Sequence, residues 1–160
     1  MKQNLDRLNY DLDLICMDVF DYEPKKLFDV ILIDPPCTAT GTIGKNPDLQ
    51  FLNPLDKLEE LSDIQEKMLT RCASWLQDNG YIIYSVCSLL KQEGEDQISR
   101  FLKKNKEFCL IHPKKKGYLD QEGYETNKES GIRIMPFFEE GLGGTEGFFI
   151  AYLHLKRKSN

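Results

Sequence analysis

Short apolar runs recur along the chain, separated by longer segments in which polar residues dominate. The runs are rich in Val, Ile, Phe and Tyr, which favour strands, and a strand covered on both faces of a sheet has few polar positions. On this pattern we expect strands over 12–18, 28–34, 81–87, 107–113 and 147–155.

Helical spacing marks residues 54–78, where apolar residues recur every three or four positions from Leu55 to Leu76. That period places them on one face of a helix, which opens at a proline and closes at an Asp-Asn-Gly turn. A second helix is expected over 92–105, because acidic residues come early in it and lysines late, as the helix dipole favours.

Two segments complete the pattern. Residues 3–9 have the character of the last turns of a helix, and residues 114–131 are polar and glycine-rich, which predicts a surface loop. Strands that alternate with helices indicate an α/β fold with a mostly parallel sheet, in a single domain over 1–160.

Ligands of parallel α/β sheets bind beyond the carboxyl ends of the strands. Asp18, the Asp34–Cys37 stretch (Asp-Pro-Pro-Cys) and Cys87 each follow an expected strand end. We therefore expect these residues at one edge of the sheet, where a site could form.

Composition narrows the class of protein. The chain is 41% hydrophobic and 29% charged, it has no apolar run near the ~20 residues needed to span a bilayer, and its polar start does not resemble a signal peptide. Five cysteines without a CxxC pair, and only two histidines, argue against a metal site and favour reduced thiols. These features predict a cytoplasmic protein with no membrane partner.

The net charge of −5 argues against a strong grip on nucleic acid by the whole chain, because phosphate binding needs an excess of cations. Lysine-rich stretches at 103–106, 113–117 and 155–159 are short and are typical of solvated ends. Charge therefore leaves the partner open.

The two cysteines at strand ends suggest a specific chemistry. A thiolate can add to C6 of a pyrimidine ring, which makes C5 electron-rich enough to attack an electrophilic methyl group. A carboxyl group such as Asp34 would favour the adduct, and a base must later remove the C5 proton. The alternative is that both are small apolar residues, the role we assign to Cys16, Cys72 and Cys109 within expected strands or a helix.

The motifs "DPPCTATGTIGKNPD" (34–48) and "YSVCS" (84–88) resemble the paired cysteine motifs of the RsmB/NOP2/Sun family of RNA cytosine-C5 methyltransferases. "LSDIQEKML" (61–69), "QEGEDQ" (92–97) and "GGTEGFFIAYL" (143–153) extend the similarity over the whole chain. The sequence is most similar to the bacterial branch that methylates 16S ribosomal RNA.

The resemblance implies a role for each motif residue. Cys87 would be the nucleophile, Cys37 would assist release of the methylated RNA, and Asp34 would lie beside the target base and the methionine part of S-adenosylmethionine. Asp18 would contact the adenine of this cofactor. The chain has Val86 where the family usually has threonine before the nucleophile.

The resemblance also implies a partial Rossmann-like class I methyltransferase sheet. Only eleven residues precede the first expected strand, so the family's first two strands, its glycine-rich cofactor loop and its RNA-binding domain have no counterpart here. The strand at 28–34 would then expose an apolar edge. We expect either a homodimer through this edge or a shift of the 12–18 strand to cover it.

Three functions stay open at this point. The first is a fragment of a ribosomal RNA cytosine-C5 methyltransferase with an incomplete site for S-adenosylmethionine. The second is an inactive remnant, or a folding or interaction module, of such an enzyme. The third is an amino-methyltransferase of the Asp-Pro-Pro-aromatic type, against which Cys37 in the aromatic position argues.

Overall fold

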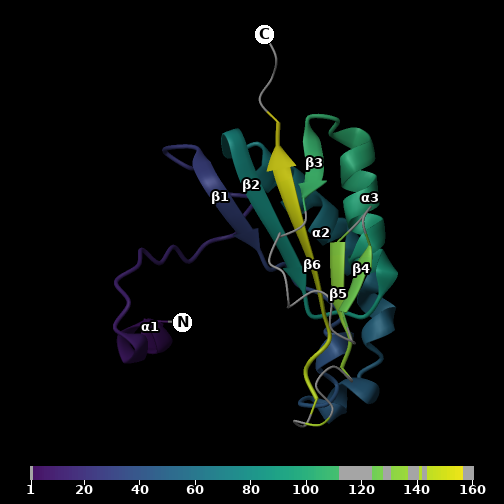
Figure 1. Cartoon of the computed structure of the whole chain (residues 1–160). Coiled ribbons are helices and arrows are strands. Elements are labelled where there is room, and N and C mark those ends of the chain that lie inside the picture. Colours follow the sequence, from purple (N-terminus) through teal and green to yellow (C-terminus); the bar gives the residue numbers. More distant parts are fainter. Residues whose placement is uncertain (1, 112–123, 128–130, 137–140, 142–143, 157–160) are drawn as a thin grey trace.

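The computed structural model describes residues 2–111, 124–127, 131–136, 141 and 144–156. Figure 1 shows one sheet whose strands are twisted against one another, with two helices packed behind it. The helices are α1 (Lys2–Leu8), α2 (Leu58–Ala73) and α3 (Glu95–Lys104), with short 3-10 turns η1 (Thr40–Thr42), η2 (Pro47–Gln50), η3 (Pro54–Lys57) and η4 (Lys91–Glu93).

The sheet has six strands in the described residues. Their order is β1-β2-β6-β5-β4, and β3 pairs with β6 beside β5. The strands are β1 (Phe28–Ile33), β2 (Leu76–Val86), β3 (Phe108–Ile111), β4 (Tyr124–Asn127), β5 (Gly131–Ile134) and β6 (Phe148–Leu155). β6 therefore lies in the middle of the sheet, although it comes last along the chain (Figure 1).

The core lies between α2, α3 and one face of the sheet. Alternate residues of β2 and β6 point to this face, as the period of a strand requires, and are fully buried. Side chains from α2 and α3 pack against this face. Helix and strand residues together form the apolar cluster Leu69, Cys72, Ile82, Tyr84, Val86, Ile98, Phe101, Phe149, Ala151 and Leu153.

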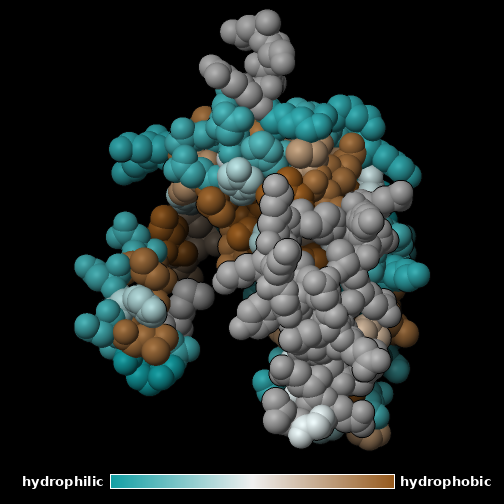
Figure 2. All heavy atoms as spheres, in the orientation of Figure 1, coloured by the Kyte–Doolittle hydropathy of each residue, from teal (hydrophilic) through white to brown (hydrophobic). Residues whose placement is uncertain are grey.

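The strand expected at 12–18 is wrong. In the structure this segment forms no helix or strand, and Leu12, Ile15 and Cys16 are exposed. Figure 1 shows the N-terminal part of the chain standing apart from the sheet, and Figure 2 shows hydrophobic atoms on the surface of that part. A strand needs a hydrogen-bonded neighbour, and among the described residues this segment has none, so its apolar run is not sufficient.

The same finding removes one expectation for the edge of β1. Residues 12–18 do not cover it, and Val30 and Leu32 are 53% and 67% exposed. Within the described residues β1 pairs only with β2. Dimerisation through this edge stays a prediction.

The expectation of a mostly parallel sheet is also wrong. β1 and β2 are parallel, but β6 runs antiparallel to β2, β3 and β5. The sequence order β1-α2-β2-α3-β3 does give strands of one direction, and β6 then inserts between β2 and β3 in the opposite direction. Periodicity predicts which residues are buried, not which strand lies between which neighbours.

Several boundaries differ from expectation. α2 ends at Ala73 rather than at residue 78, because Leu76 already belongs to β2. The loop expected over 114–131 contains β4, while its residues 114–123 and 128–130 lie outside the described part. The strands at 28–34, 107–113 and 147–155 and the helix at 92–105 are confirmed to within a few residues.

Candidate active site

Cys37 and Cys87 lie side by side, with 3.4 Å between their Sγ atoms. Each follows the carboxyl end of a strand, β1 for Cys37 and β2 for Cys87, and the two strands are parallel neighbours. The expectation that residues after the strand ends lie together is therefore confirmed for Cys37 and Cys87, whereas Asp18 follows no strand in the structure. Both side chains are only partly buried, so a ligand can approach them.

The thiol pair is electrostatically asymmetric. The hydrogen bond from Cys37 lowers the pKa of Cys87 from 9.0 to about 7, because it stabilises the thiolate. The same hydrogen bond, together with burial, raises the pKa of Cys37 well above its ordinary value. At neutral pH the pair therefore holds one proton on Cys37 and a substantial fraction of thiolate on Cys87, the form that is nucleophilic.

The two aspartates lie in different surroundings. Asp34 directly follows β1 and is exposed, and its negative charge raises the pKa of Cys87 against the stronger effect of Cys37. Asp18 lies in the irregular segment before β1, also exposed, and its Oδ1 accepts a hydrogen bond from the backbone N–H of Phe20 (2.8 Å). The structure thus brings Asp34 to the cysteines, while Asp18 caps a local turn.

A buried carboxylate anchors the loop that carries Cys37. Glu93 accepts hydrogen bonds from Thr38 N (2.9 Å), Thr38 Oγ1 (2.5 Å) and Gln65 Nε2 (2.9 Å). Gln65 Nε2 also donates to Pro36 O (2.9 Å), and Tyr84 Oη donates to the backbone oxygen of Glu93 (2.8 Å). These contacts tie the residues on both sides of Cys37 to α2, β2 and η4.

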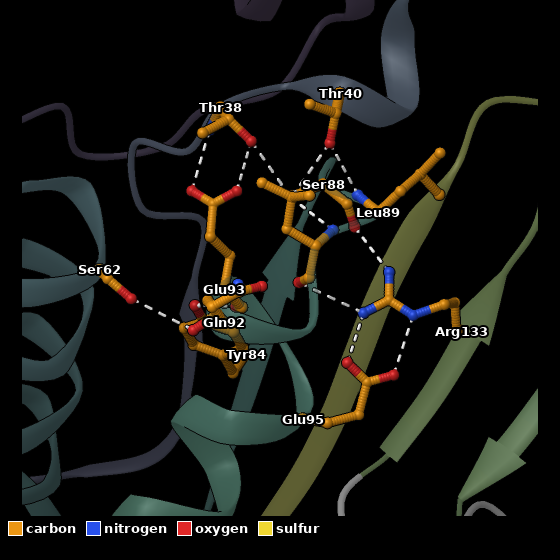
Figure 3. A network of polar contacts seen from close by, with 11 residues as sticks. Thr38, Thr40, Ser62, Tyr84, Ser88, Leu89, Gln92, Glu93, Glu95 and Arg133 are labelled. Atoms are coloured by element: carbon orange, nitrogen blue, oxygen red, sulfur yellow. Dashed lines mark hydrogen bonds and ion pairs between the residues drawn. The ribbon is translucent and has the colours of Figure 1, made fainter. Parts of the chain in front are cut away.

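A second set of contacts holds the segment after Cys87. Ser88 Oγ lies 3.3 Å from Thr40 Oγ1 and accepts from the backbone N–H of Leu90 (3.1 Å). Arg133 Nη1 donates to Ser88 O (2.9 Å), and Arg133 is itself paired with Glu95 through two hydrogen bonds (Figure 3). Bidentate pairing fixes the guanidinium plane, and with it the backbone that follows the nucleophile candidate.

The backbone is tightly packed next to the thiols. Gly41 N donates to Cys87 O (3.0 Å), and Gly147 N donates to Gly41 O (2.8 Å). A Cβ on Gly41 would lie 2.0 Å from Gly147 O, so only glycine allows this approach. Beside it is a hollow of about 680 Å³, lined by residues that include Thr40, Ile43, Lys45, Leu89, Glu146 and Phe148.

Sequence reasoning missed the supporting residues. Glu93 and Glu95 lie in "QEGEDQ" and Gln65 in "LSDIQEKML", two stretches quoted only for their resemblance, and Arg133 lies in none of the quoted stretches. The buried carboxylate of Glu93 and the buried guanidinium of Arg133 interrupt no hydrophobic pattern that would mark them in the sequence. Only the contacts of the folded chain reveal them.

The residues present fit the polar ends of S-adenosylmethionine in part. Asp34 offers an exposed carboxylate beside the thiol pair, and Asp18 keeps Oδ2 available for a hydrogen bond from an amine. Of the apolar residues near Asp18, Ile15 and Met17 are exposed, while Val19 packs against the core.

Within the described ranges, every helix falls short of the length and apolar content that a membrane crossing requires.

The sequence matches the family of 16S rRNA methyltransferases RsmB/F over residues 1–154. It is 35% identical over 156 residues to a ribosomal RNA small subunit methyltransferase B from Shewanella oneidensis, covering 96% of this chain and 34% of that protein. The protein of the same name from Photorhabdus laumondii is 34% identical over 156 residues, with 96% and 33% covered. The chain thus spans about a third of the length of these curated relatives.

A solved structure has the same fold. NSun6 from Pyrococcus horikoshii with SFG matches 99% of this chain and 38% of its own length, with a TM-score of 0.78 and 25% sequence identity. The sheet and its helices therefore form part of a class I methyltransferase domain.

Proposed function

The chain belongs to the RsmB/F family of 16S rRNA methyltransferases, and from this we propose that it carries the cysteine chemistry of an enzyme that methylates C5 of cytosine in ribosomal RNA. The observation that carries the proposal is the thiol pair at the ends of β1 and β2, with its Sγ atoms 3.4 Å apart. A cysteine that only fills space needs no second thiol beside it at the carboxyl ends of the strands. Addition to a pyrimidine, in contrast, needs a thiolate that the cytosine ring can reach.

Cys87 is the nucleophile in this proposal. Its pKa near 7 makes the thiolate available at neutral pH, and it adds to C6 of the cytosine, so that C5 becomes electron-rich. The cytosine has to leave its stack to reach the thiolate. After methylation a base removes the C5 proton, the electron pair of the C5–H bond restores the C5–C6 double bond, and the C6–Sγ bond breaks with its electron pair left on the sulfur.

Cys37 assists release. Its proton is held by the hydrogen bond to Cys87 and by burial, so it is available to the sulfur atom as the C6–Sγ bond breaks. Protonation of the departing sulfur favours product over adduct. Asp34 lies beside the pair, where its carboxyl group can contact the ring of the bound base.

S-adenosylmethionine, held in part by Asp18 and Asp34, supplies the electrophilic methyl group when bound. The chain covers about a third of its relatives, so we infer that further residues complete this cofactor site in the whole protein. The exposed apolar residues around Ile15 could form one side of the adenine pocket.

Covalent trapping tests the proposed nucleophile. RNA that contains 5-fluorocytosine cannot lose a C5 proton, so with S-adenosylmethionine it should leave a protein–RNA adduct that survives denaturing electrophoresis. We expect Cys87→Ala to abolish the adduct, while Cys37→Ala and the exposed control Cys16→Ala retain it. An adduct retained in Cys87→Ala, or lost in Cys37→Ala alone, contradicts the assignment.

Calorimetry with S-adenosylmethionine decides between enzyme and inactive module. Heat of binding supports a chain that contributes its own part of the cofactor site. No binding at millimolar cofactor would instead favour an interaction module, a function also compatible with the exposed apolar residues of β1. The amino-methyltransferase alternative predicts no adduct in any variant.

A further inference from the structure

Glu93 is a carboxylate with no exposed surface, beside the loop that carries Cys37. No lysine or arginine among the described residues forms an ion pair with it. Three hydrogen bonds satisfy its oxygens instead, two from Thr38 and one from Gln65. Burying a carboxylate is costly even when it is hydrogen-bonded, so the charge calls for a reason beyond holding a loop.

The hydrogen bonds alone do not require a carboxylate. A glutamine at this position could accept from Thr38 N and Gln65 Nε2 with its amide oxygen, since Oε1 of Glu93 accepts both of these. Its amide nitrogen could donate to Thr38 Oγ1, whose hydroxyl can also accept and could then turn toward Ser88 Oγ, 3.3 Å away. What distinguishes glutamate here is its negative charge.

That charge acts on Cys37. The pKa of the Cys37 thiol is raised first by the hydrogen bond to Cys87 and by burial, and the charge of Glu93, which is hydrogen-bonded to the neighbouring Thr38, raises it further. The other carboxylates that face the pair act on its other member: Asp34 and Glu146 both raise the pKa of Cys87. The phenol of Tyr84, also nearby, stays neutral because burial raises its pKa.

We propose that Glu93 is a positioning residue for the thiol pair. Its carboxylate holds Cys37 next to Cys87 through Thr38, so that the hydrogen bond between the two thiols can form. Its negative charge adds to the preference for the shared proton on Cys37, which leaves the thiolate on Cys87. This deepens the proposed function, because it explains how the nucleophile is selected, but its test needs neither RNA nor cofactor.

Competitive alkylation measures the distribution of the charge. A limiting amount of iodoacetamide at pH 8, followed by peptide mass spectrometry, gives the labelling of Cys87 and Cys37, each normalised to the exposed Cys16. In the wild-type chain we expect Cys87 to be labelled far faster. In Glu93→Gln we expect the Cys87:Cys37 ratio to fall by about tenfold, the change that one pKa unit produces.

Two variants serve as matched controls. Asp96→Asn removes a negative charge from an exposed position on α3 and should leave the ratio unchanged. Glu93→Asp keeps the charge on a shorter side chain and should restore most of the wild-type ratio. A merely structural role predicts the reverse order, with glutamine tolerated and aspartate harmful.

An unchanged ratio in a folded Glu93→Gln chain overturns the proposal, and so does a ratio in Glu93→Asp as low as that of Glu93→Gln. If Glu93→Gln does not fold, Thr38→Val gives the decision. This variant removes the hydroxyl hydrogen bond from Thr38 to Glu93 and keeps the charge of Glu93. The labelling of Cys87 at pH 7 should then fall relative to that of Cys16. An unchanged labelling refutes the anchoring role. If the Cys87:Cys37 labelling ratio falls in Glu93→Gln but the wild-type chain forms no adduct with RNA that contains 5-fluorocytosine, this inference holds while the proposed function fails.

Discussion

Five cysteines in one chain have different chemistry because their neighbours differ. Burial in the core raises the pKa of Cys72 to about 11, so that thiol stays protonated and packs as a small apolar residue. Cys16, expected in a strand, is exposed instead. Cys87 alone combines partial exposure with a thiol donor, the combination that favours a thiolate.

Removing the donor should raise the pKa of Cys87. In Cys37→Ala the thiolate loses its hydrogen bond, so the midpoint of the pH profile for Cys87 alkylation should move from about 7 toward the ordinary value. At pH 7 the labelling rate should fall on the order of tenfold, with little change at pH 10, where the thiolate dominates in both chains.

Cys37→Ser is the matched control, because its hydroxyl can still donate to the thiolate and should preserve most of the shift. Rates are read from the mass of the peptide that contains Cys87. A profile in Cys37→Ala that coincides with the wild-type profile would mean that the pair is not hydrogen-bonded in solution.

At the scale of elements, the strands that flank the site could be predicted, and the supports behind it could not. The apolar run of 28–34 ends at Asp-Pro-Pro-Cys, where two prolines without backbone N–H groups end the strand, so the position of Cys37 followed from the sequence. The run of 12–18 has the same apolar character and forms no strand. The difference is the presence of a partner strand, which no local pattern contains.

The uncovered edge of β1 predicts self-association. Among the residues that the structure describes, β1 pairs with β2 alone, and the backbone groups on its other side can accept a second strand, so the chain should form dimers at micromolar concentration in sedimentation velocity. Leu32→Lys should shift the equilibrium at least tenfold toward monomer, since a charge on an edge strand opposes pairing.

Leu55→Lys provides the comparison, because Leu55 is similarly exposed (57%) but lies on η3, away from this edge. A wild-type chain that stays monomeric, or a Leu55→Lys effect equal to that of Leu32→Lys, would rule out association through β1.

At the scale of the molecule, α2 and α3 cover one face of the sheet, and within the described part of the chain no helix covers the other. Ile82, Tyr84, Phe149 and Leu153 are buried beneath α2 and α3, whereas Tyr81 on the opposite face is 37% exposed and stacks on His154 with 4.7 Å between the ring centres. The apolar character of β2 and β6 was visible in the sequence and indicated strands covered on both faces, but neither their alternating burial nor the central position of β6 was. It depends on pairs about seventy residues apart.

Truncation on the two faces of β6 should therefore differ in cost. Leu153→Ala removes a fully buried side chain between β2 and β3 and should lower the free energy of unfolding by about 2–5 kcal/mol. His154→Ala, next to it on the other face, loses mainly the stacking on Tyr81, about 0.5–1.5 kcal/mol. Urea unfolding followed by circular dichroism measures both, and equal losses would contradict a one-sided core.

The place of β6 also has a consequence for biosynthesis. β1, α2, β2 and α3 leave the ribosome well before Phe148–Leu155, yet β2 gains its second neighbour only when that segment is free of the exit tunnel. Until then the growing chain presents an unpaired edge of β2 and an unfilled core. The segment after β2 that carries Cys87 thus takes its final shape only after Phe148–Leu155 has emerged, and a stop codon before residue 148 would leave the two thiols without the strand that completes their support.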